Sequence, residues 1–347
     1  MEMAPGHNAR YGRELLMASN RAFLISVIIL TALSGSIVCC AQALPQADAV
    51  RIAEFYRLSS QIEDGIWPEW SKVVSPLLLI THDKEYLTRF PRIPEGFAAT
   101  QDGFLVRDRQ FPVQLQTTFS PFGPPSVIAI GEPGATASKT TTPWEITLMH
   151  EHFHQLQFAQ PGYFEATDAL GLKHGDSSGM WMLNYAFHYD NPEINAAFVK
   201  LLDSLLSAVE ESDSKRFRHR SREYIRQRSQ FLTMLSPDDR KYMDFQLWQE
   251  GMARYIQIMA AEVAATYVPT NAYLALPDYE SFATYAPKLR QRTLHELGTV
   301  TLAKDKRVAF YSFGAVEGLL LDRLNPQWKR GYFKNPLTTE PLFAIEQ

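Results

Sequence analysis

The residues best suited to chemistry lie in the segment His150-Glu151-His152-Phe153-His154, which has the pattern HExxH. Side chains four positions apart lie on one face of an α-helix, so His150 and His154 can direct imidazole nitrogens at a single metal ion. Glu151 lies beside them and is placed to act as a general base on water, whereas His152 points to another face. The spacing therefore predicts a hydrolytic metal site.

The neighbours of this segment predict that the site is buried. Apolar residues cover much of the expected helix, namely Ile146, Leu148, Met149, Leu156 and Phe158. Such packing gives a catalytic metal the dry surroundings that it requires. Two other interpretations stay open from the sequence: a surface cluster of histidines, and a polar core in which hydrogen bonds satisfy the imidazoles.

A catalytic zinc site takes three protein ligands and keeps a fourth position open for water, so one more ligand is needed. Gln157 and Gln160 occupy the positions at which one known extension of HExxH has glycine and histidine. Asp168 and Asp176 have suitable side chains but lie in no convincing motif. The best candidate is Glu250, far downstream in the segment LWQEGMARY.

The HExxH pattern and this downstream segment resemble the gluzincin branch of the peptidase MA superfamily. In that branch a second helix presents the third ligand in a context of the type W-x-E-G-x-A, which Trp248, Glu250, Gly251 and Ala253 match here. The resemblance implies an α+β, zincin-like fold. We therefore expect a small mixed or antiparallel sheet with an edge strand over the HExxH helix, followed by a mostly helical C-terminal part.

The resemblance also implies the chemistry of the site. It assigns one Zn²⁺ per chain, with His150, His154 and Glu250 as metal ligands and Glu151 as the general base. The expected function is a zinc metallopeptidase that acts on a peptide or protein substrate. A scaffold of the same kind without turnover, serving in binding or structure, is one alternative, and a zinc hydrolase of non-peptide amides is another.

Two departures from the family pattern bear on this expectation. The HExxH segment and Glu250 are unusually far apart, so the helical hairpin expected over residues 192–235 must fold away from the site. The position four after Glu250 carries Arg254, where many gluzincins have an aspartate that supports a histidine ligand. We therefore expect the support for the histidines to come from other residues.

Further parts of the site are open to more than one interpretation. Tyr255 and Tyr311 are candidate donors to the negative charge that develops on a substrate carbonyl, but each also suits a core or surface position. The apolar run over residues 126–130 is a candidate for the edge strand that pairs with an extended substrate. It equally suits an interior strand.

The remaining chain divides into a part rich in proline, glycine and short apolar runs, residues 44–143, and a helical part, residues 144–347. We expect the two parts to form one catalytic unit. Strands are expected over residues 75–81, 103–107, 112–117 and 126–130. Helices are expected over residues 46–61, 144–157, 178–188, 192–211, 214–235, 237–267, 279–297 and 312–324.

The N-terminal segment predicts export. Arginines precede an apolar run over residues 22–38, and Ala41-Gln42-Ala43 follows, which is typical of a signal peptide over residues 1–43 with Met1 or Met17 as its start. The mature protein is then periplasmic or secreted and keeps no stable membrane span. An uncleaved N-terminal membrane anchor is the alternative.

The composition of the chain limits the classes of binding partner and of metal ligand that are expected. The 347 residues are 46% hydrophobic and carry 34 Lys+Arg against 38 Asp+Glu, so a large core is expected and no basic surface for nucleic acid is predicted. The only cysteines, Cys39 and Cys40, fall within the predicted signal peptide. The mature chain therefore has no disulfide and no thiolate ligand, which leaves histidine and carboxylate for the metal.

Overall fold

The computed structural model describes residues 43–344 apart from Ser177. The predicted signal peptide, the choice between Met1 and Met17, and the membrane-anchor alternative concern residues outside this range. Among the described residues, no helix is both long and apolar enough to cross a membrane.

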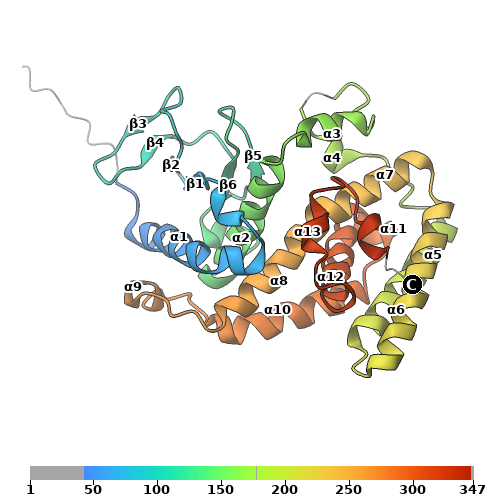
Figure 1. Cartoon of the computed structure of the whole chain (residues 1–347). Helices are drawn as coiled ribbons and strands as arrows, with labels where there is room; N and C mark the ends of the chain where they lie inside the picture. Colours follow the sequence, from blue (N-terminus) through green and yellow to red (C-terminus); the bar gives the residue numbers. More distant parts are fainter. Residues whose placement is uncertain (1–42, 177, 345–347) are drawn as a thin grey trace, which may run out of the picture. The chain divides into compact units, whose positions relative to one another are not determined.

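The architecture is α+β, as predicted, with a mixed sheet near the N-terminal end followed by a mostly helical part (Figure 1). The strands are β1 (Leu77–Ile80), β2 (Lys84–Thr88), β3 (Ala98–Ala99), β4 (Leu105–Asp108), β5 (Gln116–Phe119) and β6 (Val127–Gly131). The first helices are α1 (Gln46–Ile66), α2 (Thr141–Phe158), α3 (Tyr163–Ala169), α4 (Trp181–Asn184), α5 (Pro192–Glu210), α6 (Ser214–Met234) and α7 (Pro237–Gln246). The π-turn (Leu247–Gly251) and the helices α8 (Met252–Ala264), α9 (Asn271–Leu274), α10 (Phe282–Leu297), α11 (Leu302–Asp305), α12 (Ala309–Leu324) and α13 (Lys329–Tyr332) complete the chain.

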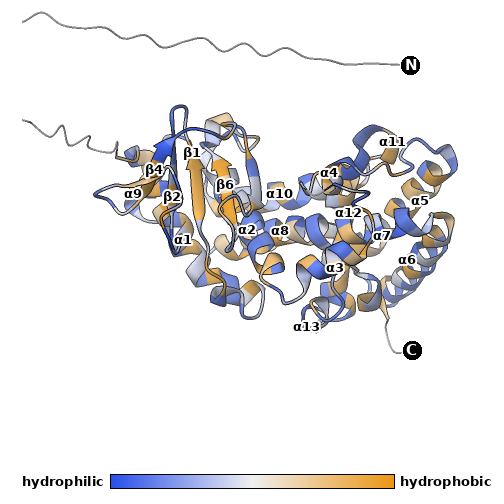
Figure 2. Ribbon diagram, turned by 90° about the horizontal axis from the view of Figure 1, so that it is seen from above, coloured by the Kyte–Doolittle hydropathy of each residue, from blue (hydrophilic) through white to orange (hydrophobic). Residues whose placement is uncertain are grey.

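The sheet is built around two strands that are buried on both faces. Its strand order is β3-β4-β2-β1-β6-β5, with β1 and β6 parallel and the other pairs antiparallel. Figure 2 shows β1 and β6 as apolar strands. Because side chains alternate along a strand, Leu77 and Ile128 face the main core, whereas Leu78 and Val127 face a smaller cluster on the other side.

The interpretation of residues 126–130 as the edge strand is wrong, and the interior alternative is correct. Strand β6 lies between β1 and β5, so β5 is the edge strand beside α2. The reason is visible in the residue types: β6 is apolar throughout because both of its faces are covered, whereas β5 contains Gln116, Thr117 and Thr118. Strands β2 and β3 were not predicted.

Strand β2 escapes a sequence prediction because it buries a charged residue, Glu85, in an ion pair. Glu85 is fully buried, and its Oε2 accepts a hydrogen bond of 2.6 Å from Nε of Arg107 on β4. Its Oε1 accepts the backbone N–H groups of Gln110 and Phe111. A strand that buries a charge in this way has no alternating apolar pattern.

Helix α2 carries the HExxH segment through the middle of the molecule. The prediction of a helix over residues 144–157 is confirmed, and the observed helix extends it by a few residues at its start. Near that start, Trp144 Nε1 donates a 2.8 Å hydrogen bond to the carbonyl oxygen of Gly131, which ties the helix to the end of β6. Helix α2 also packs on α1, α8 and α10, so its ligand residues are buried.

The helical part differs from prediction in several ways: the short helices α3, α9, α11 and α13 were not predicted, and two predicted helices are not continuous. The helix expected over residues 237–267 is interrupted by the π-turn, which carries Glu250. The helix expected over residues 178–188 is helical only in α4, because Tyr185 has an extended backbone. Helices α5 and α6 form the expected hairpin, which packs on α12 and lies at the far end of the helical part from α2 (Figure 1).

The π-turn is held against α12 by direct contact between backbones. A β-carbon added to Gly251 would lie 2.6 Å from Cα of Gly314, and one added to Gly314 would lie 2.9 Å from the carbonyl oxygen of Leu247. Neither approach leaves room for a side chain, so both positions require glycine. The position of Glu250 therefore depends on the glycine beside it, in a π-helical geometry that is common at functional sites.

We predict that Gly251→Ala destabilises the protein by about 1–3 kcal/mol, because the new methyl group forces the π-turn away from α12. Chemical denaturation measures this loss, and zinc titration should show weaker binding because Glu250 moves with the turn. The matched control is Gly65→Ala in α1, where an added β-carbon meets no atom within 4 Å. Equal stability and zinc affinity in the two variants would contradict the prediction.

Candidate metal centre

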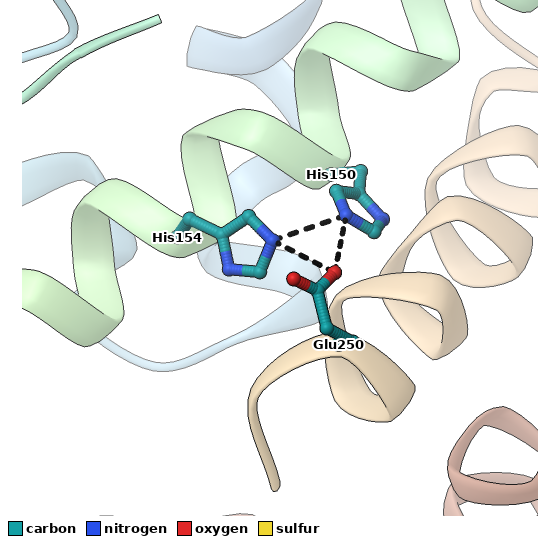
Figure 3. Close-up of side chains that lie close together, drawn as sticks. All are labelled: His150, His154 and Glu250. Atoms are coloured by element: carbon teal, nitrogen blue, oxygen red, sulfur yellow. Dashed lines mark hydrogen bonds and ion pairs between the residues drawn. The ribbon is translucent and has the colours of Figure 1, made fainter. Parts of the chain in front are cut away.

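His150, His154 and Glu250 converge as the sequence predicted. The two imidazoles project from successive turns of α2 and the carboxylate projects from the π-turn, so three side chains from two segments point at one place (Figure 3). The Nε2 atoms of the histidines are 3.1 Å apart, and Oε2 of Glu250 lies 3.5 Å from each of them. Both histidines are buried, and the Glu250 side chain is 15% exposed.

The separations of these three atoms suit a tetrahedral metal ion. Zinc binds imidazole nitrogen and carboxylate oxygen at about 2.0–2.2 Å, which places the ligand atoms of a tetrahedron about 3.3–3.6 Å apart. The observed separations of 3.1, 3.5 and 3.5 Å are close to these values. A site with three protein ligands keeps a fourth position for water or substrate, which is the arrangement of catalytic zinc sites.

The charges of the three groups are strongly coupled. Burial by itself would lower the pKa of His154, but the Glu250 carboxylate outweighs it and raises that pKa to about 9. Burial would likewise raise the pKa of Glu250, and the two histidines instead hold it well below its usual range. A divalent cation satisfies the same carboxylate without requiring a protonated imidazole, so the group suits a metal ion.

Gln157 fixes the orientation of His154. Its Nε2 lies 3.0 and 3.2 Å from the carbonyl oxygens of Trp248 and Gln249 and 2.8 Å from the hydroxyl of Tyr332. Its Oε1 therefore faces Nδ1 of His154, at 2.7 Å, and accepts the hydrogen of that nitrogen. The tautomer that results leaves the lone pair of His154 Nε2 for the metal.

His152 is the bystander that the sequence predicted, and it is part of the core. Its Nδ1 pairs with Oε1 of Gln155 at 2.9 Å, and its Nε2 lies 3.2 Å from Oε2 of Glu63 on α1. The ring of Trp70 stacks on it with centroids 5.1 Å apart. The pair His152–Gln155 has the same spacing as His154–Gln157 but lies on another face of α2. This repeated spacing of histidine and glutamine is the feature of the sequence from which the role of Gln157 could have been predicted.

Glu151 is positioned by the edge strand. The hydroxyl of Thr118 on β5 lies 2.9 Å from Oε2 of Glu151 and 2.8 Å from its carbonyl oxygen. Both residues are buried. The contact holds one carboxylate oxygen of Glu151 toward the sheet and leaves Oε1 as the oxygen available for chemistry. Sequence reasoning missed Thr118 because β5 was not recognised as the edge.

The structure separates the two candidate tyrosines. Tyr255 is fully buried, and its hydroxyl lies 2.8 and 3.0 Å from the two carboxylate oxygens of Asp322. The hydroxyl donates its hydrogen to this carboxylate, so it is not available to a substrate carbonyl. Tyr311 on α12 instead lies over a ligand: its ring is nearly parallel to that of His150, at 11°, with centroids 6.5 Å apart. Burial and the nearby Glu250 carboxylate raise the pKa of Tyr311 well above its usual value, so it is a protonated phenol.

The alternative metal ligands have other partners. Asp168 pairs with Lys173, and its side chain is 60% exposed. Asp176 accepts the backbone N–H of Trp181 at 2.6 Å and that of Ser178 at 2.7 Å, so it caps the start of α4. Neither aspartate belongs to the group formed by the two histidines and Glu250.

Arg254 does not replace the aspartate that supports a histidine in the resembled family. Its guanidinium pairs with Glu296 on α10 at 3.1 Å and donates to Oε1 of Gln257 at 2.8 Å. His150 Nδ1 is buried and has no hydrogen-bond partner among the residues described. The support expected from elsewhere is therefore provided to His154 by Gln157.

Comparisons with known proteins give no match: no protein-family model, no curated protein and no solved structure matches the chain. The structure itself shows an α+β fold and a buried His₂Glu group whose geometry suits a metal ion. This group is consistent with a zincin-like site.

We predict that Gln157→Leu lowers zinc affinity about 10- to 100-fold, because His154 loses the acceptor that fixes its tautomer and the π-turn loses a contact to α2. Competition titration with a zinc chelator measures the change. Gln155→Leu is the control, since it removes the equivalent contact of the bystander His152. If both variants bind zinc as the wild type does, Gln157 has no role at the metal.

Proposed function

We propose that this protein is an exported zinc metallopeptidase that hydrolyses peptide bonds. The observation that carries the proposal is the convergence of His150, His154 and Glu250 with Glu151 next to the first ligand. Export rests on the sequence of residues 1–43 alone. The peptidase activity rests on the chemistry of the site and on the resemblance of its two motifs to gluzincins.

The residues of the site divide the steps of hydrolysis among them. His150, His154 and Glu250 would hold the zinc ion, which would supply Lewis-acid polarisation of a substrate carbonyl and would lower the pKa of a nearby water. Oε1 of Glu151 is the free carboxylate oxygen next to His150, so it takes the proton of that water and passes it to the leaving amine. Thr118 keeps Oε2 of Glu151 turned toward the sheet during the transfer.

Tyr311 is the donor best placed for the charge that develops on the carbonyl oxygen. Its hydroxyl accepts a 2.7 Å hydrogen bond from Nη1 of Arg307, and its own hydrogen is directed toward the Glu250 carboxylate, at the place where a substrate carbonyl would bind. A donor of this kind typically contributes about 10²- to 10³-fold to the rate.

Strand β5 is a suitable place for the substrate backbone. It lies at one edge of the sheet, and its Thr118 contacts the general base Glu151. An extended peptide that adds to such an edge gains backbone hydrogen bonds and presents its carbonyl groups along the strand. A peptide is therefore a better substrate for this geometry than a small amide.

We predict that Glu151→Gln loses about 10²- to 10⁴-fold in kcat toward peptides while its zinc content stays equal to that of the wild type. Cleavage of a peptide mixture, followed by mass spectrometry, measures the activity. Glu145→Gln is the control on the same helix. Glu145 is fully buried and has no hydrogen-bond partner in the part of the chain that the structure describes, and burial raises its pKa well above the usual range, so glutamine imitates its neutral form.

The outcomes distinguish the alternatives. A folded wild-type protein without zinc, or a Glu151→Gln variant with full activity, would contradict the proposal. Zinc binding without hydrolysis of any peptide would favour a binding or structural protein on the same scaffold. Cleavage of amides other than peptide bonds would favour the alternative of a zinc hydrolase that acts on non-peptide amides.

A further inference from the structure

Arg307 lies beside the metal centre and forms no ion pair with any residue that the structure describes, although the Glu250 carboxylate acts on its charge from a longer distance. It lies in the short 3₁₀ turn Lys306–Val308 before α12, its side chain is half-buried, and its Nη1 donates a 2.7 Å hydrogen bond to the hydroxyl of Tyr311. Over residues 43–344, leaving Ser177 aside, no carboxylate lies within ion-pair distance of its guanidinium. Other buried arginines are paired, as Arg107 is with Glu85 and Arg228 with Glu317.

The charges around the site leave one positive charge in excess, which is that of Arg307. A divalent metal ion in this group would be neutralised by two carboxylates, its ligand Glu250 and Glu151, which also acts electrostatically on His154. The guanidinium then adds one positive charge that no described residue compensates. An unpaired charge that is partly withdrawn from water is costly, and a bound anion removes this cost.

The positive charge is confined to one end of the ligand group. Arg307 lies on the His150 side, one hydrogen bond beyond Tyr311. On the other side, the ring of Phe158 stacks on His154 with centroids 6.1 Å apart, and the exposed Phe164 lies next to Phe158. The site therefore offers a substrate an aromatic end and a cationic end.

We infer that Arg307 binds a carboxylate of the substrate. Guanidinium has five N–H donors in a planar fork that matches a carboxylate, and the contact to Tyr311 uses one of them. This inference rests on the proposed function, because it names the substrates of the same site. The carboxylate is either the C-terminal group of a peptide or an acidic side chain near the cleaved bond.

A role limited to orienting Tyr311 makes a different prediction. A residue that only positions the phenol would affect all substrates alike and would act mainly through kcat. A residue that binds a carboxylate affects only the substrates that carry one, and acts through KM and through binding in the absence of turnover.

The test uses pairs of peptides that differ in one charge. One pair compares a free C-terminal carboxylate with the C-terminal amide, and a second compares glutamate with glutamine at successive positions of an amidated peptide. Binding is measured by calorimetry to the zinc-loaded Glu151→Gln protein, with and without Arg307→Met. Kinetics with the wild type and Arg307→Met give KM and kcat for the same peptides.

We expect one acidic peptide to bind more tightly than its neutral partner, and Arg307→Met to weaken the acidic peptide about 10- to 100-fold while leaving the neutral one nearly unchanged. The pair that shows the preference identifies the source of the carboxylate. Arg307→Lys keeps the charge without the fork and should lose part of the preference, which guards against a folding defect in the methionine variant.

Equal binding of both members of each pair, equal losses for acidic and neutral peptides in Arg307→Met, or no binding of any peptide would overturn the inference. Hydrolysis without a preference for acidic peptides would overturn it while leaving the peptidase proposal intact. A preference in binding that depends on Arg307, without hydrolysis by the wild type, would support the inference and overturn the peptidase proposal.

Discussion

The carboxamide of Gln157 joins the two segments on which the metal centre depends. Its amide nitrogen faces the carbonyl oxygens of Trp248 and Gln249, and its oxygen faces Nδ1 of His154. A glutamine can satisfy both sides in only one orientation, so the position of the π-turn and the tautomer of the histidine are set together. The third ligand, Glu250, directly follows these carbonyl groups.

The contact between Gly251 and Gly314 supports the π-turn from its other side. Gln157 approaches the turn from α2, and α12 closes against it with backbone in contact. Helix α12 also carries Tyr311 above His150, so the packing that fixes a metal ligand also positions the nearest phenol. The candidate metal ligand Glu250 and the phenol Tyr311 thus depend on the same packing of α12 against the π-turn.

Much of this arrangement follows from the sequence, because some constraints are local. The spacing of His150 and His154 determines a shared helical face, and the apolar residues around them determine burial. Glu250 was found from its short motif. The bounds of α2 were predicted to within three residues at its start and one residue at its end, since a helix start signal and a following Pro161-Gly162 mark its ends.

Other features depend on contacts that a sequence does not display. The position of β5 at the edge follows from how the strands associate. The apolar composition of residues 126–130 suits an interior strand and an edge strand alike, so the sequence alone did not distinguish the two positions. The π-turn results from close packing against Gly314, which is 63 positions beyond Gly251. Tyr311 belongs to the site only because α12 packs against the π-turn and α8, and Arg307 belongs to it because it lies just before α12.

The zinc content of the purified protein tests the central claim most directly, when it is measured by mass spectrometry for the wild type, Glu250→Ala and Asp168→Asn. The proposed function predicts about one zinc per chain in the wild type and in Asp168→Asn, and loss of the metal in Glu250→Ala. Full zinc content in a folded Glu250→Ala protein would show that the three side chains do not form the metal site.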